Sequence, residues 1–66
     1  MIEVYVGICS CMIGVDRSLE IVYAGIDHHK ALEAVRNHKF ECDLFQSGWI
    51  ETWVDGEIVG RSDIIR

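Results

Sequence analysis

Hydrophobic and polar residues alternate at the start of the chain. Every second residue from Ile2 to Ile8 is Ile or Val, with Glu, Tyr and Gly between them. This period of two is typical of a β-strand with one face on a core. Leu19–Ala24 reads LEIVYA, which is rich in β-branched and aromatic residues and predicts a second strand pairing with the first as an antiparallel hairpin. Residues 10–18, with Gly14 and Asp16, are expected to form the loop between them.

A helical pattern follows at Asp27, which has a side chain suited to an N-cap. The stretch HHKALEAVRNHK continues as good helix material to about Lys39. At 100° per residue, one stripe of this helix collects His28, Ala31, Leu32 and Val35. We therefore expect one face of the helix to dock on a sheet.

The last third of the chain predicts three more strands. Alternation over residues 40–45 indicates one strand, followed by a polar turn at residues 46–48. WIETWV and EIVG then flank Asp55-Gly56, a dipeptide typical of a two-residue type I′ hairpin turn. The predicted fold is a single α+β domain over residues 1–66, an antiparallel sheet packed on one helix in the order ββαβββ.

Both faces of this last hairpin carry apolar side chains. Pairing across the turn sets Trp53 opposite Ile58, on the same face as Trp49, while Ile50 and Val54 lie on the other face. A single helix covers only one face of a sheet. We therefore expect a second polypeptide on the other face, either another copy in a homodimer or a foreign protein.

Charge and cysteine content restrict the partners and the compartment. The formal net charge of -5 opposes direct binding to nucleic acid or to an anionic membrane, and residues 40–60 contain acidic residues but no Lys or Arg. Such an acidic surface can steer a basic partner toward it, or can simply keep the protein soluble. Three cysteines without a signal peptide indicate reduced thiols in a soluble, cytoplasmic protein.

We expect no metal site, no active site and no cofactor. His28 and His38 are ten positions apart, which separates them by about 15 Å on a helix. Only a combination such as Cys9, Cys11 and one histidine, or His38 with Cys42, stays possible for a metal. Ser10, Cys42, His38 and Asp43 supply residue types used in nucleophilic catalysis, but no catalytic motif frames them.

The segments VYAGIDHHKALEAVRNHK and WIETWVDGEIV together resemble small ββαββ-type proteins encoded by bacteriophages and prophages. The resemblance spans most of the chain, and the Cys-Ser-Cys segment at residues 9–11 departs from it. It implies a host-directed accessory protein, commonly an inhibitor that counters a bacterial defence system or a host enzyme by stoichiometric binding.

The leading hypothesis is thus a small acidic protein that acts as a homodimer and inhibits a host or defence protein by occluding a basic surface on it. Its contact residues are aromatic or aliphatic anchors and selecting carboxylates: Trp49, Glu51, Trp53, Asp55, Glu57 and Ile58. The alternatives are a self-associating structural module with no inhibitory partner, and a metal or thiol sensor that uses Cys9, Cys11 and a histidine.

Overall fold

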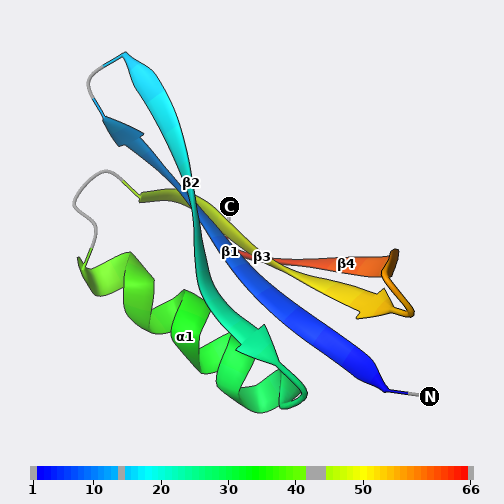
Figure 1. Cartoon of the computed structure of the whole chain (residues 1–66). Coiled ribbons are helices and arrows are strands. Elements are labelled where there is room, and N and C mark those ends of the chain that lie inside the picture. Colours follow the sequence, from blue (N-terminus) through cyan, green and yellow to red (C-terminus); the bar gives the residue numbers. More distant parts are fainter. Residues whose placement is uncertain (1, 14, 42–44, 66) are drawn as a thin grey trace.

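The computed structural model describes residues 2–13, 15–41 and 45–65 of the chain. A four-stranded antiparallel sheet with strand order β2-β1-β3-β4 packs against one helix (Figure 1). The elements in chain order are β1 (Glu3–Ile13), β2 (Asp16–Gly25), α1 (His28–Glu41), β3 (Phe45–Val54) and β4 (Glu57–Ile65). The α+β class is therefore confirmed, as is the antiparallel sheet on a single helix.

The predicted order ββαβββ is wrong by one strand, and the observed order is ββαββ. Phe40 and Glu41 continue the helix, and residues 42–44 lie outside the described residues. The expected turn at residues 46–48 is instead part of the continuous strand β3. The alternation at residues 40–45 misled because a short apolar pattern also fits the end of an amphipathic helix.

The first hairpin is longer than expected. β1 and β2 stay paired as far as Ile13 and Asp16, so most of the loop predicted at residues 10–18 is strand. The second hairpin turns at Asp55-Gly56 as predicted, and both residues have the positive φ angles, 52° and 79°, that a type I′ turn requires. The ends of β1 and β2 that pair at Ile13 and Asp16 lie at the opposite end of the sheet from the β3–β4 turn (Figure 1).

The helix begins as its sequence predicts. The Oδ1 atom of Asp27 accepts a hydrogen bond of 3.2 Å from the backbone N–H of Lys30, which satisfies one of the orphan donors of the first turn. Ala31 and Val35, from the predicted stripe, are fully buried. His28 is exposed at the start of the stripe, where its ring makes an edge-on contact with Tyr5 at 5.0 Å.

The core beneath the helix is made of small side chains. Its buried members are Cys9, Ala31, Val35 and Ile50. Gly7 allows the helix to approach closely, because a Cβ atom there would lie 3.1 Å from Cγ2 of Val35. The odd-numbered residues of β1 therefore form the face under the helix, and the row of Ile and Val at even positions points to the other side of the sheet.

Candidate functional site

The helix packs on only one face of the sheet, and none of the other described elements covers the opposite face (Figure 1). We call that opposite side the open face. Its members follow from the strand register, which places cross-strand neighbours on the same side. They include Val4, Val6 and Ile8 of β1, Leu19 and Ile21 of β2, Trp49, Glu51 and Trp53 of β3, and Ile58, Arg61 and Asp63 of β4.

Large apolar side chains on this face are exposed to solvent. Leu19 and Ile21 on one edge strand are 60% and 70% exposed, and Ile58 on the other edge strand is 49% exposed. Trp53 and the three β1 residues between these edges are half-buried. The prediction that Trp49, Trp53 and Ile58 share a face away from Ile50 is confirmed by the pairings Trp53 with Ile58 and Gly7 with Ile50.

One carboxylate organises both indoles of this face. Glu51 lies between Trp49 and Trp53 on β3, and each of its two oxygens accepts an indole N–H at 3.2 Å. Hydrogen bonds to a charged acceptor are stronger than those to a neutral one. These two bonds hold the N–H edge of each indole against the Glu51 carboxylate. The polar atom of each indole is thereby paired within the chain, and the apolar ring surfaces are left for contacts.

A cation covers the first of these indoles. The guanidinium carbon of Arg61 stands 4.5 Å from the ring centroid of Trp49, and its Nε donates to Oδ1 of Asp63 at 3.1 Å. Trp49 is only 6% exposed although it lies on the open face. Trp49 is thus already packed, and among the predicted anchors Trp53 and Ile58 offer more accessible surface.

The structure divides the predicted contact residues into two groups. Trp49, Glu51, Trp53 and Ile58 lie together on the open face, whereas Glu57 pairs with Val54 and points to the helix side. Asp55 lies in the turn between them. Val54 also pairs with Glu3, so the strand register adds this acidic residue, which the sequence hypothesis did not include, to the acidic end of the sheet.

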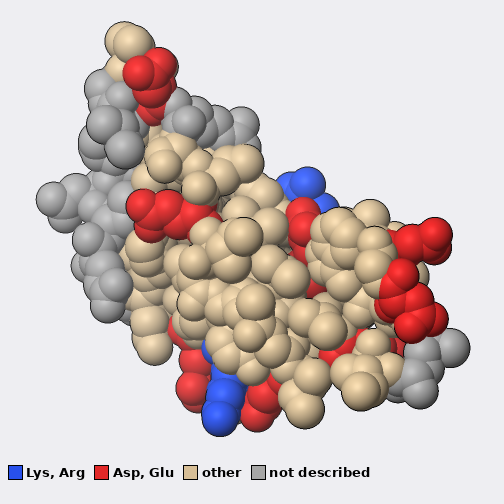
Figure 2. Space-filling view, in the orientation of Figure 1, with Lys and Arg blue, Asp and Glu red and all other residues tan. Residues whose placement is uncertain are grey.

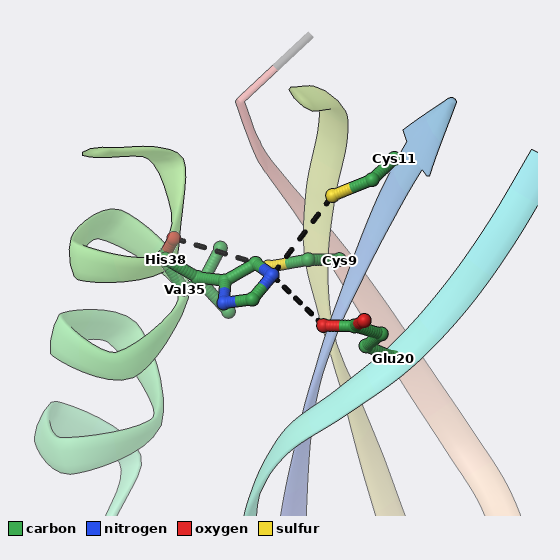
Figure 3. A network of polar contacts seen from close by, with 5 residues as sticks. All are labelled: Cys9, Cys11, Glu20, Val35 and His38. Atoms are coloured by element: carbon green, nitrogen blue, oxygen red, sulfur yellow. Dashed lines mark hydrogen bonds and ion pairs between the residues drawn. The ribbon is translucent and has the colours of Figure 1, made fainter. Parts of the chain in front are cut away.

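A second polar cluster lies between the helix and the edge strand β2 (Figure 3). The Nε2 atom of His38 is 3.0 Å from Oε2 of Glu20 and 3.9 Å from Sγ of Cys11. Because both contacts use the same ring nitrogen, this imidazole is not arranged as a base between a carboxylate and a thiol. The cluster instead links the C-terminal half of α1 to β2.

The two cysteines of this region differ in state. Cys11, which the sequence predicts as a reduced thiol, is disulfide-bonded. Cys9 is a free, buried thiol whose Sγ lies 3.9 Å from the carbonyl oxygen of Val35, and burial with the nearby charge of Glu20 raises its pKa to about 11. A thiol with such a pKa is a poor nucleophile and a poor metal ligand at neutral pH.

Neither cluster resembles a metal centre. Among residues 2–13, 15–41 and 45–65, no three His, Cys, Asp or Glu side chains converge in a way that could hold an ion. No helix in the same described ranges is both long and apolar enough to cross a membrane. Comparisons of the chain with protein families, curated proteins and solved structures found no match.

Proposed function

We propose that this chain is a non-catalytic protein-binding module that inhibits a host or bacterial defence protein by covering part of its surface. The observation that carries this proposal is the open face, where Leu19, Ile21 and Ile58 are exposed on the two edge strands and two indoles lie between these edges on β3. Exposed apolar surface on one face marks interaction sites in soluble proteins, and Trp is a favoured anchor in them.

The acidic end of the sheet supplies selectivity for a basic partner. Glu3, Asp55 and Glu57 lie around the turn of the β3–β4 hairpin. Figure 2 shows acidic side chains at this end of the molecule next to a broad uncharged surface. Carboxylates at the rim of an interface speed the approach of a positively charged surface and reject an acidic one.

We propose that this action takes place in the cytoplasm of a bacterial host, as the resemblance to small phage-encoded proteins implies. Disulfides are rare in that compartment because glutathione and thioredoxin keep thiols reduced. The Cys11 disulfide would therefore have to persist against a reducing pool while the protein acts there.

Affinity capture with matched charge variants tests the proposal. Immobilised wild-type protein, Glu57→Lys and Glu33→Lys are incubated with bacterial lysate, and retained proteins are quantified by mass spectrometry. Both substitutions change the net charge equally at exposed positions, but only Glu57 lies at the acidic end. We expect a partner on the wild type and on Glu33→Lys that Glu57→Lys loses.

A purified partner should then form a stoichiometric complex and lose its own activity in it. Retention of no protein above a bare matrix would contradict the binding proposal. Equal retention of a partner by all three proteins would contradict only the role of the acidic end and would leave the binding proposal in place.

The second candidate is a structural module that associates only with itself. The small number of charged side chains on the open face favours it, because two copies of an acidic chain can meet there with little repulsion. This candidate predicts a self-associating protein from which no foreign partner is captured.

A further inference from the structure

We propose that the open face is occupied by a second copy of this chain, packed sheet against sheet about a two-fold axis. The inference rests on the proposed function only in taking the open face as an association surface. With a second copy on that face, a foreign partner would bind at the acidic end, which lies at its rim. It names a particular occupant and requires no foreign protein.

The distribution of charge on the described residues favours a second copy over an unrelated protein. The chain carries a net charge of -5, so two copies repel each other over most of their surface. The acidic side chains on the open face are Glu51 and Asp63, and each is paired with donors of its own chain. The other acidic side chains that are described lie on the helix side of the sheet, at the start of or on the helix, or in the β3–β4 turn: Glu3, Asp16, Glu20, Asp27, Glu33, Asp55 and Glu57.

The open face is also large enough for a stable pair. Its four strands of 9 to 11 residues, at about 4.8 Å between strands and about 3.3 Å per residue, span roughly 19 by 30 Å, or roughly 600 Å². Two such faces bury roughly 1,200 Å², which reaches the lower end of the range for specific interfaces. The core beneath the helix, built from Cys9, Ala31, Val35 and Ile50, leaves a chain of this size with much apolar surface still to cover.

The composition of the face suits a symmetric interface. In a two-fold pair the same face of both copies is in contact and each contact between different residues occurs twice, so an arginine of one copy can meet a carboxylate of the other. Arg61 and Asp63 lie beside Trp49 and provide both signs on neighbouring positions of β4. Aromatic residues and Arg are enriched in interface cores, and exposed aliphatic residues such as Ile21 extend the contact to the edge strand.

Two substitutions of the same kind test this inference. Ile21→Glu introduces a carboxylate on the open face at a residue that is 70% exposed. Ile26→Glu introduces the same group at a residue that is 72% exposed but lies between β2 and the helix, outside the four strands that form the open face. Because both side chains are largely solvated in the single chain, neither change should disturb its fold, which circular dichroism checks.

The mass in solution is measured by sedimentation equilibrium at tens of micromolar. We expect twice the 7.5 kDa chain mass for the wild type and for Ile26→Glu, and the single-chain mass for Ile21→Glu. Leu19→Lys, an exposed open-face change of opposite charge, should also give the single-chain mass and decides the matter if Ile21→Glu does not fold. On dilution, the tryptophan emission of the wild type should shift to longer wavelength, since Trp49 and Trp53 both lie on this face.

A single-chain mass for the wild type would overturn the inference, and so would dimers that survive both open-face substitutions. A monomeric wild type that still captures a foreign partner would leave the proposed inhibitory function standing. A dimer that captures nothing would contradict that function and leave the second copy in place.

Discussion

Gly7 of β1 lies directly beneath Val35 of α1. A Cβ atom at Gly7 would stand 3.1 Å from Cγ2 of Val35, 3.4 Å from the carbonyl oxygen of Ala31 and 3.4 Å from Cγ2 of Val22. The helix therefore rests on the sheet at the one β1 position under it that has no side chain. The distance between the helix and the sheet determines how completely Cys9 and Ile50 are buried, because both belong to the same core cluster as Val35.

Replacement of Gly7 by valine should destabilise the fold. The added methyl groups would press on a fully buried side chain and on helix backbone, and overpacking of this kind costs about 1–3 kcal/mol. Gly60→Val is the matched control, because the nearest atom to a Cβ there is the Cβ of Thr52 at 3.9 Å. Thermal unfolding should show a clear loss for Gly7→Val and little change for Gly60→Val, and equal melting temperatures would contradict the close contact.

The helix should depend on the side chain of Asp27. Asp27→Ala removes the acceptor for the backbone N–H of Lys30, a loss that costs about 0.5–2 kcal/mol at an N-cap. Asp27→Asn keeps an oxygen acceptor at the same place and should retain most of the stability. Urea unfolding of the three proteins compares them, and an alanine variant as stable as the wild type would show that the cap contributes nothing.

Local patterns predicted the parts of this fold that local interactions determine. The Asp55-Gly56 turn needs two residues that tolerate positive φ, and the helix start needs an acceptor side chain at Asp27. The face that carries Trp53 and Ile58 follows from counting outward from that turn. Each of these features involves residues that are only a few positions apart.

The errors arose where contacts between residues far apart in the sequence determine the structure. The alternation at the start of β1 identifies two faces but not the one that meets the helix, and Gly7 with its missing side chain selects the face with fewer apolar residues. Counting outward from the Asp55-Gly56 turn would set Thr52 opposite Val59, but a bulge at Val59 sets it opposite Gly60. Glu20 and His38 come together only because α1 folds back across β2.

Cys9 should resist alkylation in the folded protein. Its thiol is fully buried and its pKa is raised to about 11, so the thiolate that reacts with iodoacetamide is scarce at pH 8. Peptide mass spectrometry should find slow labelling of Cys9 in buffer and fast labelling in urea. Fast labelling in buffer would show that the core opens often or that the thiol is accessible.

The same thiol should make stability depend on alkaline pH. The folded protein holds the Cys9 proton more tightly than the unfolded chain, because the pKa rises from 9.0 to about 11 on folding. Its contribution is therefore fully present below pH 9 and is lost as pH rises toward 11. Tyr5 acts in the same direction, since its hydrogen bond to Glu3 also raises its pKa. Cys9→Ala should weaken the loss of melting temperature between pH 8 and 11, and an identical pH profile would contradict the assignment to Cys9.

Arg61 should shield Trp49 from solvent. Its guanidinium stands 4.5 Å from the centroid of the ring, an interaction of about 0.5–1 kcal/mol at an exposed site. In a Trp53→Phe background, where Trp49 is the only tryptophan, Arg61→Ala should shift the emission to longer wavelength and increase quenching by acrylamide in dilute solution. Arg36→Ala removes an exposed helix cation away from Trp49 and should leave both readouts unchanged. If Arg61→Ala also changes neither, the burial of Trp49 comes from its strand neighbours and the cation is not its cover.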